Sequence, residues 1–234
     1  MEDFILKNYN SLTYSVEIIA AVTGILLFNK YKYTVAKYFI FFLCYLSVGD
    51  IFNTYTKFIK NNGVLSFLEG TVLEKNYWWS TLYWKIGAIL FFVFYFQKIL
   101  KTEKFRNIIK YSGFVFLIVS LVHIMINWDY FFSRFFPIIS IMGVIIIFEC
   151  TVFYFVEVLQ SDKVLTFYKS INFYISSAIF VWWLIITPIV FYDIYGENRD
   201  LIYIHLRRFI YLSANILMYL TFTFALIWCK PEND

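Results

Sequence analysis

The stretch from Phe136 to Val158, FPIISIMGVIIIFECTVFYFVEV, decides the fold class of this chain. An α-helix needs about 20 mainly apolar residues to cross a bilayer, and this stretch is long and apolar enough to do so. Backbone amides in hydrocarbon must be satisfied within their own segment, which favours a helix. A barrel strand would alternate between polar and apolar residues over about ten positions, and this stretch does not alternate. It therefore predicts a transmembrane helix.

The rest of the chain repeats this pattern. Of its 234 residues, 61% are apolar and 24% aromatic, whereas soluble domains hold roughly 45–50% apolar residues. The predicted spans are Ser11–Phe28, Val35–Thr56, Trp79–Phe96, Tyr111–Trp128, Phe136–Val158, Ser170–Tyr192 and Leu201–Trp228. The connections are too short for a soluble domain. The sequence predicts one all-α, polytopic membrane domain of seven transmembrane helices over residues 1–234, with the first apolar run kept as a helix.

The loop charges predict the orientation of the spans, because short cytoplasmic loops are enriched in Lys and Arg. One set of connections holds eleven basic residues: Lys30, Lys32, Lys37, Lys98, Lys101, Lys104, Arg106, Lys110, Lys163, Lys169 and Lys230. The other holds six: Lys7, Lys57, Lys60, Lys75, Arg134 and Arg199. This bias predicts that the N-terminus is outside and the C-terminus cytoplasmic.

The predicted loop from Gln97 to Lys110 supplies five of the eleven basic residues on the cytoplasmic side. Two interpretations of this charge remain open. It is either a topology signal with affinity for anionic membrane lipids or a docking surface for a partner protein.

Polar residues inside the spans gather in the predicted outer half of the bundle. Ionisable groups there cost about 2.5–3.5 kcal/mol each on insertion scales, and they usually face the bundle interior. His123 and Asn127 are four residues apart and so share a helix face. The residues predicted to line a ligand site are Glu17, Asp50, Asn53, Lys85, His123, Asn127, Trp182, Trp183, Arg207 and Arg208.

Two interpretations of this group remain open. The carboxylates of Glu17 and Asp50 could pair with Lys85 and one arginine simply to join helices, although desolvation offsets most of such an attraction. Alternatively, the group lines an outward-facing cavity. Its formal charge would be about +1, and the expected guest would be a small anionic or zwitterionic molecule or an ion. Trp182 and Trp183 would then form the floor of the pocket, or would simply be packed.

Several chemistries lack the residues they need. Ser213-Ala214-Asn215 has a superficial similarity to the Ser-Ala-Lys of microbial rhodopsins, but no lysine lies in the seventh span to bind retinal. The histidines His123 and His205 are not paired at metal-binding spacing. We expect no cofactor, no metal, no nucleic-acid partner and no enzymatic activity, although His123 with Asp50 leaves a lipid-modifying enzyme open.

Four stretches together resemble a known family. They are Glu17-Ile-Ile-Ala-Ala-Val-Thr-Gly24, Tyr154-Phe-Val-Glu157-Val-Leu-Gln-Ser161-Asp-Lys163, and Asn215-Ile-Leu-Met-Tyr219 with Leu226-Ile-Trp-Cys-Lys230. The chain resembles seven-helix inner-membrane proteins of the Bacteroidota over its whole length. No activity is established for that family. Its members occur near sensor histidine kinases, so the resemblance implies a link to signalling.

The leading functional prediction is a sensory or accessory membrane subunit. It would bind its ligand or ion in the outer half of the bundle and signal to a partner protein docked on the Gln97–Lys110 loop. A small-solute or ion transporter or channel, and a structural assembly factor in which the buried charges only pair, are the alternatives.

Overall fold

The computed structural model describes residues 8–59, 63–195 and 201–231, and every regular element within these ranges is a helix. The long helices are α2 (Tyr9–Leu26), α4 (Ala36–Asn53), α6 (Ile89–Ile99), α7 (Glu103–Ile126), α9 (Pro137–Leu159), α10 (Ile171–Tyr195) and α11 (Leu201–Trp228). The third long segment begins with α5 (Tyr77–Ser80) and the π-helix η3 (Thr81–Ala88), which lead directly into α6. The all-α prediction is confirmed.

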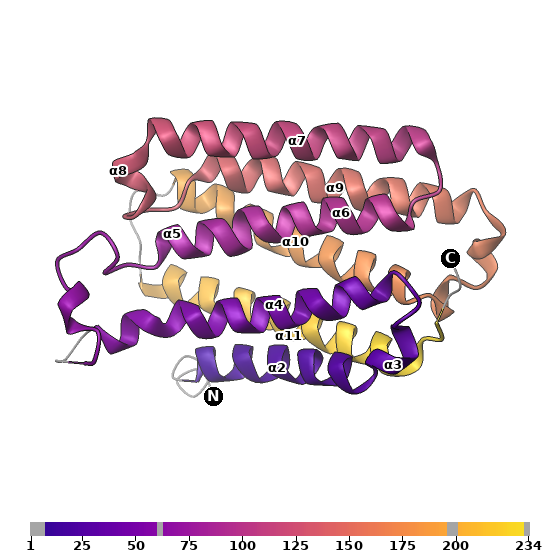
Figure 1. Ribbon diagram of the computed structural model, residues 1–234, viewed down its shortest axis with the longest axis horizontal. Helices are drawn as coiled ribbons and strands as arrows, with labels where there is room; N and C mark the ends of the chain where they lie inside the picture. Colours follow the sequence, from indigo (N-terminus) through magenta and orange to yellow (C-terminus); the bar gives the residue numbers. More distant parts are fainter. Residues whose placement is uncertain (1–7, 60–62, 196–200, 232–234) are drawn as a thin grey trace.

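Successive long segments run in opposite directions and form an elongated bundle (Figure 1). Six of them form a closed ring in the order α2, α4, α6, α9, α10 and α11, and α11 returns to pack on α2. The helix α7 lies outside this ring, against α6 and α9. We name the two ends of the bundle after short helices: the α5 end, and the α3 end at α3 (Phe28–Tyr31).

The outside of the bundle is apolar. Among the described residues, six helices are long and apolar enough to cross a membrane: Ala36–Phe58, Tyr77–Ile99, Glu103–Ile126, Pro137–Leu159, Ile171–Tyr192 and Ile202–Trp228. Large apolar side chains such as Phe41, Met125 and Ile227 are exposed on these outer faces. Contiguous apolar surface of this kind needs a nonaqueous partner. The structure therefore fits a multi-pass membrane protein.

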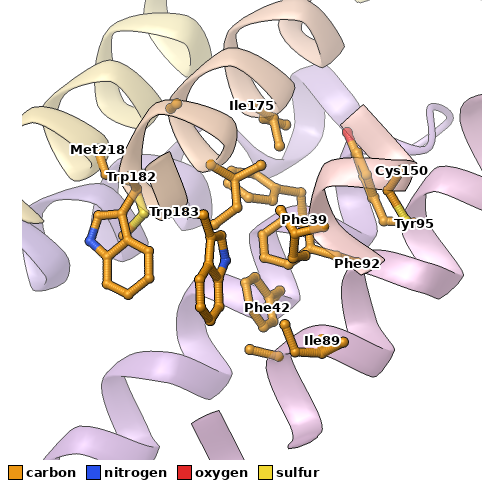
Figure 2. Close-up of a cluster of buried hydrophobic side chains, with 14 of the residues drawn as sticks. Phe39, Phe42, Ile89, Phe92, Tyr95, Cys150, Ile175, Trp182, Trp183 and Met218 are labelled. Carbon is orange, nitrogen blue, oxygen red and sulfur yellow. The ribbon is translucent and has the colours of Figure 1, made fainter. Parts of the chain in front are cut away.

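Aromatic rings fill the centre of the ring of helices, mainly toward the α3 end (Figure 2). The Phe39 ring of α4 packs edge-on against Phe222 of α11, with centroids 4.8 Å apart. Phe42 stacks on Phe91 at 3.9 Å. A polar contact lies within this core, where the buried Tyr95 hydroxyl donates to Asn172 Oδ1 at 2.6 Å.

The predicted Gln97–Lys110 loop is mostly helical, which corrects its boundaries. Helix α6 ends at Ile99 and α7 already begins at Glu103, so only a short turn joins them. The Glu157 carboxylate caps the start of α7, because its oxygens accept from the backbone N–H groups of Lys101 (2.9 Å) and Thr102 (2.6 Å). A carboxylate is favourable at the positive end of a helix dipole. The exposed residues Lys104, Arg106 and Lys110 therefore lie on the first turns of a helix.

At the α3 end of the bundle, Lys30 and Tyr31 of α3 are hydrogen-bonded to the end of α11. The Tyr31 hydroxyl donates to the carbonyls of Leu226 and Cys229, each at 2.9 Å, and Lys30 Nζ donates to those of Leu226 and Ile227, each at 3.0 Å. These bonds satisfy carbonyls that the end of α11 leaves without helical partners. Burial raises the pKa of Tyr31, so its hydroxyl keeps the proton that it donates.

Candidate functional site

Two acidic side chains, Glu17 and Asp50, lie close together inside the bundle. Glu17 projects from the middle of α2 and is only 1% exposed, and Asp50 projects from the last turn of α4 and is half-buried. The Glu17 carboxyl interacts with Asp50, with the Ser47 hydroxyl of α4 and with the Tyr219 hydroxyl of α11. The pair therefore lies where α2, α4 and α11 meet. These are two of the predicted site residues, brought together from different helices.

The hydrogen bonding of Glu17 is incomplete. Among the residues that the structure describes, no group forms a hydrogen bond of normal geometry with either of its carboxyl oxygens, and the Ser47 hydroxyl is unsatisfied as well. Buried polar groups nearly always have a partner, so each exception needs an explanation. An ionised carboxylate without donors in an apolar interior is especially unfavourable. Other buried hydroxyls of the described residues, such as those of Thr13 and Ser120, also lack a partner, but Glu17 is the acid among these groups, and packing alone does not explain it.

Asp50, in contrast, has a donor. The Tyr83 hydroxyl donates a hydrogen bond to Asp50 Oδ1. Tyr83 belongs to the π-helix η3, and π-helical segments occur frequently at functional sites. Its own carbonyl accepts from the Tyr45 hydroxyl of α4 at 2.8 Å. Tyr83, the donor, and Asp50, the acceptor, are therefore both positioned by contacts between η3 and α4.

A glycine makes room for the Tyr83 ring. A Cβ atom built on Gly49 would lie 2.5 Å from Tyr83 Cδ2, closer than van der Waals contact permits. The Trp79 indole stacks on the Tyr83 ring at a centroid distance of 5.4 Å, and its Nε1 donates to the Gly49 carbonyl at 2.9 Å. Gly49 and Trp79 therefore fix the position from which Tyr83 reaches Asp50.

Asn53 lies one turn beyond Asp50, where it joins two segments. Its Oδ1 accepts from the Ser80 hydroxyl at 3.1 Å, and its carbonyl accepts from Asn76 Nδ2 at 3.0 Å. Both partners belong to the start of the third long segment. The contacts of Asn53 hold α4 against α5 at the α5 end of the bundle.

The Lys85 side chain contacts a different part of the bundle from the acidic pair. Its Nζ donates to the Ser140 hydroxyl of α9 at 2.6 Å and lies 4.4 Å from the centroid of the Phe135 ring. On α7, the His123 ring packs edge-on against Phe136 at 4.9 Å, and Asn127 Nδ2 donates to the His123 carbonyl at 3.0 Å. These contacts place Lys85, His123 and Asn127 among α7, α9 and η3, apart from the junction of α2, α4 and α11.

The arginines of α11 approach the acidic pair from the α5 end. Arg207 is half-buried, with its guanidinium 5.6 Å from the centroid of the Tyr211 ring, whereas Arg208 is exposed. Both arginines and Asp50 interact electrostatically with Tyr9 at the start of α2. Of the two neighbours, Arg207 is the one that packs against the bundle.

The paired tryptophans Trp182 and Trp183 are buried in the aromatic core (Figure 2). Their rings pack edge to face at 5.1 Å, and Trp182 Nε1 donates to Asn215 Oδ1 of α11 at 2.7 Å. A groove of about 600 Å³ opens on the outside of the bundle between α10 and α11. Its lining is Tyr174, Ser213, Ile216, Leu217, Leu220, Thr221 and Phe224, and contains none of the predicted site residues.

Sequence reasoning did not single out Ser47, Tyr83 or Tyr219 as neighbours of the acidic pair. Ser47 could have been found, because it lies three residues before Asp50 and so on the same helix face. The chain holds 20 tyrosines, and nothing local distinguishes Tyr83 or Tyr219 from the others.

Within the described residues there is no group of three or more His, Cys, Asp or Glu side chains that could hold a metal ion.

Comparisons with protein-family models, curated proteins and solved structures found no match for this chain.

Proposed function

We propose that this chain is a sensory or accessory subunit of a bacterial inner membrane that binds an ion at the Glu17–Asp50 pair and signals to a partner protein. The proposal is carried by the buried carboxyl of Glu17, which no donor of normal geometry reaches among the described residues. Intramembrane ionisable residues usually mark ligand or ion sites. The resemblance to Bacteroidota seven-helix proteins found near sensor kinases supports the signalling role.

The proposed arrangement has seven spans, with α2 as the first, the α5 end outside and the α3 end cytoplasmic. Packing of α2 between α4 and α11 supports its role as a span, and the excess of Lys and Arg in the connections at the α3 end supports the orientation. The acidic pair then lies between the middle and the outer surface of the membrane. An ion arriving from outside would reach it past Tyr9 and Arg207.

The proposed guest is positively charged. A preference for an anion or zwitterion would depend on Lys85 lying beside the carboxylates, and Lys85 instead bonds to Ser140. The groups that interact with the Glu17 carboxyl are a second acid and hydroxyls. Carboxylate and hydroxyl oxygens suit a proton or a hard cation.

The proposed output surface is the basic start of α7. Lys104, Arg106 and Lys110 are exposed there, and α7 lies outside the ring of helices, where a partner can reach it (Figure 1). The turn before α7 is held by Glu157 on α9. A shift of the third segment or of α9 would therefore move this surface.

Affinity purification of the tagged protein from native membranes tests the proposed subunit role. We expect a defined partner to co-purify with the wild type and to be lost when Lys104, Arg106 and Lys110 are replaced together by Gln. Replacement of Lys57 and Lys75, which are exposed at the opposite end, is the matched control and should retain the partner. If only the protein itself is recovered, or if both variants lose the partner equally, the proposed docking surface is wrong.

An ion transporter is the second candidate, because a carboxyl buried in a membrane also suits ion transfer. Glu149 of α9 is a further half-buried carboxylate along the bundle. The densely packed aromatic core toward the α3 end counts against a continuous polar route. Counterflow in proteoliposomes that is abolished by Asp50→Asn or Glu149→Gln would favour transport over sensing.

A further inference from the structure

We infer that the ion held by the Glu17–Asp50 pair is a single proton, carried by Glu17 and shared with Asp50. This inference rests on the ion site proposed above and names its ligand. It follows from how the hydrogen-bond donors around the two carboxyls are distributed.

The donors are unequal. Asp50 accepts from the Tyr83 hydroxyl, which stabilises a negative charge on Asp50. Glu17 is 1% exposed and has no donor of normal geometry among the described residues. A proton on Glu17 changes one of its oxygens from an unsatisfied acceptor into a donor that can bond to Asp50. Two carboxyls that share a site cannot both ionise readily, so the pair favours one proton and one negative charge.

The groups around the pair favour a proton over a metal cation. From α2 itself Tyr14 faces the pair, from α4 Ser47, from η3 Tyr83 and from α11 Tyr219. These four neighbours are hydroxyl groups, and each is uncharged while it keeps its proton. On α11, Arg207 and Arg208 interact with Tyr9. A metal cation would need six or more oxygens at bonding distance, whereas a proton needs only the two carboxyls already in contact.

Loss of the proton has a structural consequence. The Glu17 O–H bond breaks, its electron pair remains on the carboxylate and the proton passes to water on the outer side. Two negative charges then face one another in an apolar interior and repel. Asp50 is bound to Tyr83, so its displacement pulls directly on the π-helix η3 and on the third segment. Proton occupancy is thus coupled to the position of a helix.

Infrared difference spectroscopy of the full chain in lipid vesicles, titrated with pH, tests the inference. We expect the carbonyl band of a protonated carboxylic acid at neutral pH, lost in Glu17→Gln and shifted in Asp50→Asn. Glu149→Gln is the matched control, a second half-buried intramembrane carboxyl, and it should leave this band in place. Absence of such a band from the wild type, or its persistence unchanged in Glu17→Gln, would overturn the inference.

A second measurement distinguishes a failure of the proton assignment from a failure of the proposed ion site. The melting temperature of the detergent-solubilised protein should be independent of NaCl, with choline chloride at equal ionic strength as the reference. A stabilisation specific to Na⁺ that disappears in Glu17→Gln, with no protonated carboxyl band, would overturn the proton and leave the proposed ion site standing. Glu17→Gln should itself fold, because an amide has the shape of a neutral acid. If it does not fold, Glu17→Asp replaces it, because its carboxyl can also carry the proton. The protonated carboxyl band should then persist at a shifted frequency, and an unshifted band would overturn the assignment to Glu17.

Discussion

Two buried polar sites in this bundle, one around Tyr95 and one around Glu17, differ in how completely their hydrogen bonds are satisfied. Toward the α3 end, the Tyr95 hydroxyl and Asn172 bond to each other within a dense set of aromatic rings. Where α2, α4 and α11 meet, Glu17 is equally buried but lacks a donor of normal geometry among the described residues. Native proteins tolerate unsatisfied buried groups mainly where function requires them. The difference separates a region that holds the bundle together from the region that we propose binds a proton.

Removing a central ring tests the structural region, and we expect the largest effect here. Phe92 is 1% exposed, and Phe92→Ala should lower the free energy of unfolding by about 3 kcal/mol through the cavity it leaves. Phe41→Ala is the matched control, because Phe41 is 56% exposed on the outside of α4, and it should cost less than about 1 kcal/mol. Unfolding by SDS in mixed micelles measures both. Equal losses would mean that the core is not where stability is concentrated.

Filling the space beside Tyr83 tests the ligand region. In Gly49→Ala the new methyl would collide with the Tyr83 ring at 2.5 Å, and overpacking of this kind costs about 1–3 kcal/mol. The shifted ring should also weaken the bond to Asp50, so the infrared carboxyl band should move.

Gly24→Ala is the control for this change, because its Cβ would lie 3.1 Å from Ile40 Cγ2, far from the pair. It should leave the carboxyl band unchanged. An unchanged band in Gly49→Ala would show that the Tyr83 contact does not determine the state of the pair.

A matched pair of tyrosine variants sharpens the comparison directly. Tyr95→Phe should lower stability by about 1 kcal/mol, the scale of one hydrogen bond inside a membrane protein, with no change in the carboxyl band. Tyr83→Phe removes a donor that stabilises negative charge on the pair. The pH at which the carboxyl band disappears should therefore rise by about 1 unit. If the two variants exchanged these effects, the assignment of roles to the two regions would be reversed.

The fold could be predicted from sequence because it depends on composition and segment length. Apolar runs such as Phe136–Val158 predicted helices, and the helix α9 covers almost that range. The prediction of a Gln97–Lys110 loop was wrong in its boundaries. The loop was the gap between the predicted apolar spans that end at Phe96 and begin at Tyr111, whereas capping by Glu157 across the bundle lets α7 begin at Glu103.

The candidate site could be predicted only in part. Depth along each helix brought out Glu17 and Asp50, and the structure places them together. The direction of Lys85 could not be read from spacing, because it depends on the π-helix η3, whose extra residue per turn rotates the side chains that follow. Tyr83 could not be found for the same reason.

The smallest stability effect is expected for Glu17→Gln. An amide reproduces the size and neutrality of a protonated acid, so the free energy of unfolding at neutral pH should change by less than about 0.5 kcal/mol, within the range of neutral substitutions. Asp50→Asn is the matched control, because Asn keeps the length of the Asp50 side chain. It should cost more, since an uncharged amide accepts more weakly from Tyr83. A larger loss in Glu17→Gln than in Asp50→Asn would contradict the assignment of the proton to Glu17.

The protonation state of Glu17 is measured most directly by solid-state NMR of the protein in bilayers, with ¹³C in its Glu carboxyls. The resonance missing from the Glu17→Gln spectrum identifies the residue. We predict that this resonance has the chemical shift of a neutral carboxylic acid at neutral pH. A carboxylate shift at neutral pH would contradict the account.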